Sequence, residues 1–588
     1  MCFKHSLIKI RIWGPHCLLL FWLTLLCWII WRHAAQSLQP PIYDAISYFL
    51  KAKYFWANIT AGYLFNPLNI PPLERPFGTV LMSFPLGWSE NFHGFYFRSV
   101  FFPIACLITS VYLATGLSQA KISKGATISV AFLFSSLPLF YHFELVEYIP
   151  PGCGTWGLVD NFQAGIAAVA TAALIRSVKT TSLRWLAAGA VLASFTLFVK
   201  PSGALIMTLT GSTWFIITAL AYFRSRISTE AKHYATYGVF GCLLLLTLFI
   251  STLTLCLLSG YLSKEHFIFQ DHALSVIRNN LNPSMSQMVA MVHATIGEPI
   301  VIYISFFMAL FFSKKSICNL HYNAFTKLYD FIIAAFIVWG GGLYLLIKVA
   351  GIVQIRQIAP FFLMGLIYLI PVINEIYFQI NRLARITIFL MCFLIAANTA
   401  LLLAYENPSI PWQKASGVSV STNTNREEIQ LAYSFLNKVR IGNHTVKVYN
   451  FNGLDAGPVT FTSVGHYELY MRPNYPTFWS DYQYNLLDNY VTRVRSVLSS
   501  DYLLFQKIPD DQEIKNILNI KTVDTFETEH RIFQAWLNDL SETDGVKSAI
   551  EGSRIRLLRI TDQSLFTKSI YRLIDNHTWR SDFEAANF

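Results

Sequence analysis

Long apolar runs dominate the first 405 residues of the chain. Clear examples lie at 18–31, 239–258, 331–346 and 386–403. A run of about 20 apolar residues can cross the hydrocarbon core of a bilayer, which is about 30 Å thick. A buried helix of a soluble protein rarely stays apolar on every face over that length. The pattern therefore predicts a polytopic α-helical membrane protein.

The length rule predicts about eleven transmembrane helices, all within residues 1–405. Two of them, at 162–176 and 185–199, are short for a full crossing. The predicted spans are 14–32, 99–117, 126–141, 162–176, 185–199, 203–223, 237–260, 299–312, 329–349, 358–376 and 386–405.

The pattern changes after the last run, and residues 406–588 are predicted to form a soluble domain of mixed α/β class. Short segments rich in Val, Ile, Tyr and Phe are typical of strands, whereas apolar residues three and four apart indicate helices. Strands are predicted at 445–451, 458–471, 502–506 and 555–560, and helices at 425–439 and 486–498.

Charge supports this assignment and gives it a direction. Only 13% of the residues are charged, against about 25% in an average soluble domain. The formal net charge of +11 comes mainly from Lys and Arg in short loops between apolar runs, as the positive-inside rule requires. The charge is therefore interpreted as a mark of the cytoplasmic loops and not as a nucleic-acid-binding surface.

Lys4, Lys9 and Arg11 precede the first span and predict a cytoplasmic N-terminus. An odd number of spans then places residues 406–588 outside the cytoplasm.

The outer side also receives the longest connections of the membrane part. A first outer loop spans 33–98, and a further long one spans 259–298. Inner loops are brief. Since binding and catalytic residues concentrate on loops held by a rigid scaffold, we expect the chemistry on the extracytoplasmic side.

Two carboxylates stand out at the start of predicted helices on that side. Asp44 follows the first span by about a dozen residues and opens an amphipathic segment. Asp160 precedes the short apolar run at 162–176. An ionisable residue at membrane depth is a functional candidate. The alternative for both is a helix cap, a position that Asp favours.

Two basic residues lie on the outer side against the positive-inside trend. Lys200 joins two apolar runs, and Arg356 precedes another. Both are suited to bind a phosphate at the outer interface. The alternative is that they extend to lipid headgroups.

Further outer-loop residues are weaker candidates for substrate binding. They are Glu74, Arg75, His266, His272 and Arg278. Cys and His show no spacing typical of a zinc site, so no metal ligands are predicted.

Together these elements resemble the integral-membrane glycosyltransferases of the GT-C fold, and within them the bacterial aminoarabinose-transferase and protein O-mannosyltransferase-like group. In that family an acid follows the first span, a second acid lies in the next outer loop, and a basic residue binds a lipid phosphate. The positions that match are Asp44, Asp160, Pro71-Pro72-Leu73, Lys200-Pro201-Ser202-Gly203, and Arg356 with Pro360.

The resemblance implies transfer of a sugar from a polyprenyl-phosphate donor to a hydroxyl of a glycan, lipid or protein acceptor. It implies inversion at the anomeric carbon with Asp44 as general base, and a bacterial inner membrane as the location. The sequence departs from the family at Ala45, where many members have a second acid, and at Ile70, where they have His. These departures leave a divalent metal and the acceptor class open.

Two other functions fit a polytopic membrane protein. A transporter would also carry intramembrane charges, but the chain has no internal repeat of the kind that transporters show. A lipid-linked glycan ligase or polymerase would use similar basic residues with a lipid-pyrophosphate donor.

Overall fold

The computed structural model describes the helices and strands named below and some adjoining residues. The described residues are 2–36, 44–62, 77–81, 92–115, 121–141, 159–225, 230–259, 328–345, 355–404, 446–451, 477–481, 497–521, 526–553 and 555–577, with 428, 431, 432, 435, 436, 438, 439 and 494. The chain divides into two compact units, each described by itself. The first comprises Met1–Gln36 and Ser47–Ser421, and the second Ser37–Ile46 and Thr422–Phe588.

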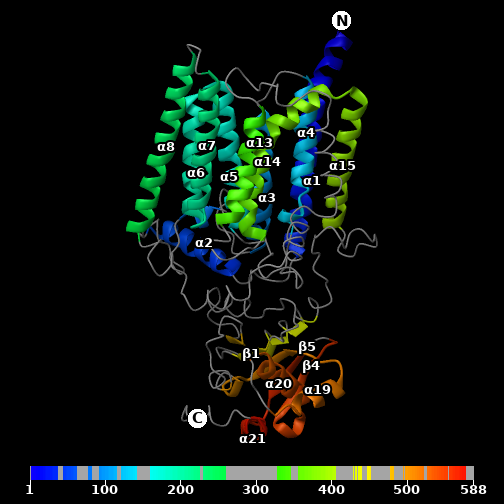
Figure 1. The fold of residues 1–588 in the computed structure, drawn as a ribbon. Coiled ribbons are helices and arrows are strands. Elements are labelled where there is room, and N and C mark those ends of the chain that lie inside the picture. Colours follow the sequence, from blue (N-terminus) through cyan, green and yellow to red (C-terminus); the bar gives the residue numbers. More distant parts are fainter. Residues whose placement is uncertain are drawn as a thin grey trace. The chain divides into compact units, whose positions relative to one another are not determined.

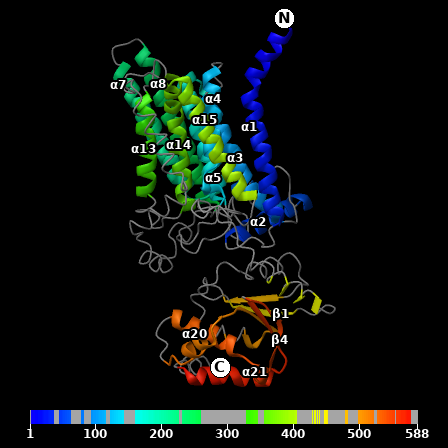
Figure 2. The same cartoon turned by 90° about the vertical axis from the view of Figure 1, so that its right-hand side faces the viewer.

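The first unit is a bundle of long helices that lie side by side (Figure 1). Helix α2 (Asp44–Ala61), most of which belongs to this unit, runs across one end of the bundle (Figures 1 and 2). The long helices are α1 (Cys2–Gln36), α3 (Phe92–Thr115), α4 (Lys121–Ser135), α5 (Asp160–Thr180), α6 (Leu183–Val199), α7 (Gly203–Ser225), α8 (Glu230–Leu258), α13 (Leu328–Leu345), α14 (Ile355–Gln379) and α15 (Arg382–Ala404).

Five of the described helices are long and apolar enough to cross a membrane, by length and composition. The five segments are Phe97–Thr115, Gly203–Arg224, Ala235–Leu258, Ile358–Gln379 and Arg382–Leu401. Shorter apolar segments lie in α1, α4, α6 and α13. A described helix overlaps each predicted span except 299–312, which lies outside the described residues. The count of about eleven spans is not confirmed and stays a prediction.

Large apolar side chains face outward from the bundle, as expected for a surface in contact with lipid. On α8, Leu243, Leu246 and Ile250 are each more than half exposed. An exposed apolar surface of this kind is not tolerated in water. The apolar helices therefore indicate an integral membrane protein.

Helix α5 is largely enclosed, with 17 of its 21 residues buried. Alanines make up much of its surface, so neighbouring backbones approach closely. A Cβ added at Gly165 would lie 3.1 Å from Cα of Pro103 in α3. Helices α3, α6 and α14 pack against α5. The ends of α5 are therefore fixed by their neighbours.

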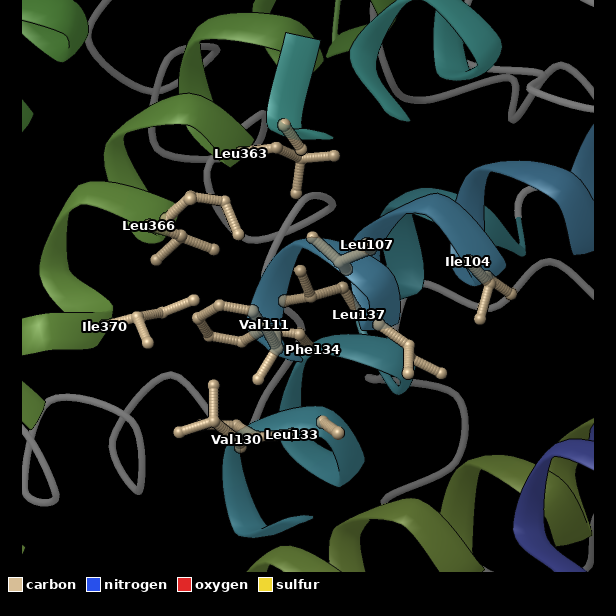
Figure 3. Packing of buried hydrophobic residues seen from close by; sticks show 14 of the residues in the cluster. Ile104, Leu107, Val111, Val130, Leu133, Phe134, Leu137, Leu363, Leu366 and Ile370 are labelled. Carbon is tan, nitrogen blue, oxygen red and sulfur yellow. The ribbon is translucent and has the colours of Figure 1, made fainter. Parts of the chain in front are cut away.

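The apolar core continues between α3, α4 and α14. Figure 3 shows Leu107 and Val111 of α3 beside Phe134 of α4, with Leu366 and Ile370 of α14 close by. All five side chains are buried. Helices far apart in the sequence thus share one core.

A buried ion pair joins α7 to α13. Arg224 lies in the last turn of α7, and Asp330 lies in the first turn of α13. The guanidinium holds the carboxylate through both of its terminal nitrogens, with 2.9 Å from Nη1 to Oδ1. Nη1 also donates to the Tyr329 hydroxyl at 2.7 Å. The Asp330 side chain is fully buried, so this pair is part of the internal packing of the bundle.

The second unit contains a five-stranded mixed sheet. The strand order is β2-β1-β3-β5-β4, with β1, β2 and β3 parallel and the other pairings antiparallel. The strands are β1 (Lys447–Phe451), β2 (Thr477–Asp481), β3 (Tyr502–Gln506), β4 (Val546–Glu551) and β5 (Ile555–Ile560), and the helices are α19 (Asp511–Leu518), α20 (Phe526–Asp539) and α21 (Gln563–Asn576).

Both faces of this sheet are covered, because successive side chains of a strand point to opposite faces. Leu503 and Phe505 of β3 pack in one core with residues of α19, α20 and α21. Tyr502 and Leu504 pack in a second core with Ala432 and others. The mixed α/β class predicted from the sequence agrees with this unit. The segment 458–471, predicted as a strand, lies outside the described residues.

His577 ties the end of α21 to the segment after α19. Its Nδ1 donates to the carbonyl oxygen of Ile520 at 2.8 Å. Burial lowers the pKa of the imidazole below its ordinary value of 6.5, although the hydrogen bond to Ile520 opposes this effect. Below pH 6.5 the unfolded chain therefore binds a proton that the folded chain resists. The contribution of His577 to stability is complete above pH 6.5 and falls as the pH drops through the lowered folded pKa.

We therefore expect α21 to lose protection between pH 7.5 and pH 5.5. Hydrogen exchange of the full-length protein, corrected for the intrinsic pH dependence of exchange, measures this loss. His577→Asn keeps an N–H for Ile520 but has no titrating ring, so it should show a smaller loss. Equal losses in both proteins would contradict the assignment.

Candidate functional site

Helices α5 and α6 form an antiparallel hairpin that brings Asp160 and Lys200 together. Only Thr181 and Ser182 separate the two helices. A connection this short forces them to run in opposite directions as neighbours. The first residue of α5 therefore lies level with the end of α6. Asp160 is that first residue, and Lys200 directly follows α6.

The two side chains form an almost dry ion pair. Nζ of Lys200 lies 2.5 Å from Oδ1 of Asp160, with 16% and 4% of the side chains exposed. The residue at the cap position of α5 is Val159, so Asp160 does not act as the helix cap. The Lys200 side chain binds a carboxylate within the bundle and does not extend to lipid headgroups. For these two residues, the observed ion pair therefore replaces both alternatives, the helix cap for Asp160 and the contact with lipid headgroups for Lys200.

A piece of the first long loop packs beside this pair. The short 3-10 helix η1 (Phe77–Thr79) lies on the last turn of α6, where the Phe77 and Phe198 rings stack with centroids 5.6 Å apart. A Cβ added at Gly78 would lie 2.4 Å from the carbonyl oxygen of Phe198. Only glycine permits this approach. The segment after Glu74 and Arg75 is therefore held within two residues of Lys200.

Two uncharged side chains near the pair were not foreseen from the sequence. Gln163 is 1% exposed and bonds to the α6–α7 turn. Asn161, also 1% exposed, donates from Nδ2 to the carbonyl oxygen of Leu139 at 3.3 Å. The signal available in the sequence was a polar residue within three positions of Asp160 in a mostly apolar helix. An amide is a weaker signal than a carboxylate there, because it carries no charge.

The structure places the remaining predicted residues less completely. Asp44 is the first residue of α2, and Arg356 lies in the first turn of α14, but their side chains lie outside what the structure describes. The weaker candidates lie outside the described residues altogether, namely Glu74, Arg75, His266, His272 and Arg278. Only Asp160 and Lys200 are therefore observed in contact.

The pair defines what the site can do chemically. A carboxylate at a helix N-terminus is favoured by the helix dipole, and it holds the ammonium of Lys200 in a site with little water. An ammonium there can hold an oxyanion far more strongly than in bulk solvent. Among the described residues, no group of three or more His, Cys, Asp or Glu could hold a metal ion.

Comparisons with known proteins return solved structures of membrane glycosyltransferases. No family model and no curated protein matches the chain. The chain is similar in structure to ArnT from Cupriavidus metallidurans bound to undecaprenyl phosphate, with a TM-score of 0.47, 10% identity, and coverage of 92% of this chain and 98% of ArnT. The apo state of the same protein gives a TM-score of 0.42 at 12% identity, covering 94% and 99%.

A third similar structure is the archaeal oligosaccharyltransferase AglB from Archaeoglobus fulgidus in complex with an inhibitory peptide and a dolichol-phosphate. Its TM-score is 0.36 at 12% identity, covering 83% of this chain and 69% of AglB. Since all three TM-scores and identities are low, we argue the function from the site itself. ArnT and AglB are glycosyltransferases of the GT-C fold, the group that the sequence motifs resemble.

Proposed function

We propose that this protein is an integral-membrane glycosyltransferase that moves a sugar from a polyprenyl-phosphate donor to an acceptor hydroxyl on the extracytoplasmic side. The observation that carries the proposal is the nearly dry ion pair of Asp160 and Lys200. A lysine held in this way at the end of a bundle of apolar helices suits a ligand that is both lipid and phosphate. The short motifs of the sequence around Asp44, Lys200 and Arg356 support the same class.

The leaving group explains why a fixed ammonium is useful. As the bond between the anomeric carbon and the phosphate oxygen breaks, the lipid phosphate gains negative charge. A preorganised cation in a low-dielectric site stabilises that charge in the transition state. In the proposal Lys200 supplies this cation, together with Arg356. Asp160 serves Lys200 by keeping its ammonium in place.

The attacking group needs a base. An acceptor hydroxyl becomes a good nucleophile as its proton is removed, and a positioned general base contributes about 10²–10⁴ in rate. We assign this role to Asp44, at the start of α2. The hydroxyl proton passes to Asp44, the oxygen bonds to the anomeric carbon, and the lipid phosphate leaves from the opposite face. The sugar is therefore inverted.

The test compares cells that contain and lack the protein. Mass spectrometry of surface glycans and lipid-linked sugars should show one sugar missing and its polyprenyl-phosphate form accumulated when the protein is absent. The wild-type gene should restore the sugar, whereas Asp44→Asn should not. Leu246→Ala, on the outward face of α8, is the control and should restore it fully.

Other outcomes identify other functions. Accumulation of a lipid-pyrophosphate form would favour a ligase or polymerase. Unchanged glycans and unchanged lipid-linked sugars would exclude glycosyl transfer. Transfer at the wild-type rate by purified, folded Asp44→Asn would remove Asp44 from its role as base.

A further inference from the structure

The turn between α6 and α7 is a tight connection at the candidate site. Lys200 adopts an extended backbone with φ −157° and ψ 149°, the region that a residue before proline prefers. Pro201 and Ser202 follow, and α7 begins at Gly203. A Cβ added at Gly203 would lie 2.3 Å from the backbone nitrogen of Leu197. The turn therefore folds back closely on the last turn of α6.

One side chain of α5 binds this turn at two points and the last turn of α6 at a third. Nε2 of Gln163 donates to the carbonyl oxygens of Thr196 and Lys200, at 3.0 and 3.2 Å. Its Oε1 accepts from the Ser202 hydroxyl at 2.9 Å. Gln163 is 1% exposed, so water does not compete for these bonds. Both N–H groups and the amide oxygen are used, and the amide orientation is fixed by this pattern.

Gln163 and Asp160 act on the same lysine from one helix face. They are three residues apart in α5, so their side chains lie on the same side of the helix. Asp160 binds the ammonium of Lys200, and Gln163 binds its backbone carbonyl. A lysine side chain is flexible, so its charge is placed well only if both ends are held.

We infer that Gln163 is a positioning residue, which fixes the backbone of Lys200 so that its ammonium meets the phosphate of the donor. The inference rests on the proposed function. It names a residue that does not touch substrate and acts through Lys200. A misplacement of about 1 Å can cost about 10²-fold in rate. Loss of the Gln163 hydrogen bonds should therefore weaken the binding of the lipid phosphate as well as lower the stability of the fold.

The variant Gln163→Met tests this inference, because it keeps the volume and removes all three hydrogen bonds. In nanodiscs, the affinity for undecaprenyl phosphate and for dolichol phosphate should fall by about tenfold or more, the usual cost of losing one hydrogen bond to a charged group. In a Lys200→Met background the same substitution should cause no further loss, because Gln163 acts through the lysine. Additive losses would show a general packing effect and overturn the inference.

The matched control is Tyr237→Phe. The Tyr237 hydroxyl donates to the carbonyl oxygens of Ser177 and Ser182, at 3.1 and 3.3 Å, and so holds the other connection of α5, the one to α6. Its loss should lower the melting temperature and leave donor affinity unchanged. A fall in donor affinity equal to that of Gln163→Met would also overturn the inference.

A second readout separates this inference from the proposed function. Competitive acylation followed by mass spectrometry reports how accessible the Lys200 amine is, whether or not a donor binds. Gln163→Met should label Lys200 faster than the wild type does. Unchanged labelling overturns the inference. If Gln163→Met labels Lys200 faster but the wild type binds neither lipid phosphate, Gln163 places Lys200 and the proposed function is wrong.

Discussion

Replacing Lys200 by Met is expected to lower sugar transfer by about 10²–10³-fold, the usual cost of removing one preorganised group that stabilises transition-state charge. Met keeps much of the apolar stem and removes the ammonium. The Asp160 carboxylate, 4% exposed, then loses the ammonium that pairs with it. Breaking one side of a buried pair costs about 3–5 kcal/mol of stability, so the variant should also melt at a lower temperature.

The double variant Lys200→Met/Asp160→Asn separates the two effects. Removing both charges of a buried pair is often neutral for stability, so the melting temperature should recover. Transfer should not recover, because the ammonium proposed to face the leaving phosphate is still absent. Initial rates with a polyprenyl-phosphate sugar and melting curves in detergent measure both. Recovery of transfer with recovery of stability would mean that the pair is only structural.

Breaking the Arg224–Asp330 pair is expected to give the largest loss of stability elsewhere in the bundle. Arg224→Met leaves a fully buried carboxylate at Asp330 without its guanidinium, at a cost of about 3–5 kcal/mol. Arg224→Lys should rescue little, because an ammonium cannot reproduce the two-pronged contact with the carboxylate. Thermal unfolding of the purified protein measures the effect, and Arg224→Met/Asp330→Asn should recover most of it.

Transfer by the protein that remains folded should be unchanged in these variants. Arg224 lies 21 positions beyond Gly203 in the same helix, which is about 30 Å at a rise of about 1.5 Å per residue. The pair is therefore remote from Lys200. A melting temperature equal to that of the wild type in Arg224→Met would contradict the expected role.

The sequence marked Asp160 and Lys200 as candidates and left Arg224 in the loop after the predicted span 203–223. It gave no role to Asp330, which falls within the predicted span 329–349, and it paired none of these residues. Asp160 and Lys200 were candidates separately, although the antiparallel hairpin of α5 and α6 brings them together. The two-residue connection between these helices could have shown this, had the ends been known to within a residue. Arg224 was interpreted only as a loop charge. Its pairing with Asp330 depends on packing between helices about 100 residues apart, which no local pattern encodes.

Two strands of the second unit, β3 and β5, show that a local sequence pattern can be enough to predict the bounds of an element. The strands predicted at 502–506 and 555–560 have the bounds of β3 and β5, because both are rich in apolar β-forming residues. Strand β4 and helices α20 and α21 had no predicted counterpart, and neither had strand β2 (Thr477–Asp481). It ends in Ser and Asp and lies at the edge of the sheet, so it has a weak hydrophobic signal. Helix α19 buries only Ile514 and Ile517 and gives a similarly weak signal.

The enclosure of α5 has a consequence for the order of events during synthesis. Helix α5 is not among the helices apolar enough to cross a membrane alone, and part of its cover, α14, is translated almost 200 residues later. Its polar groups Asp160 and Gln163 find their partners at once in the next helix and turn, at Lys200 and Ser202. We expect α5 and α6 to enter the bilayer together, as a hairpin in which Asp160 and Gln163 already have partners. The contacts of Asp160 and Gln163 that shape the proposed donor site would then also be the ones that let this part of the chain enter the membrane.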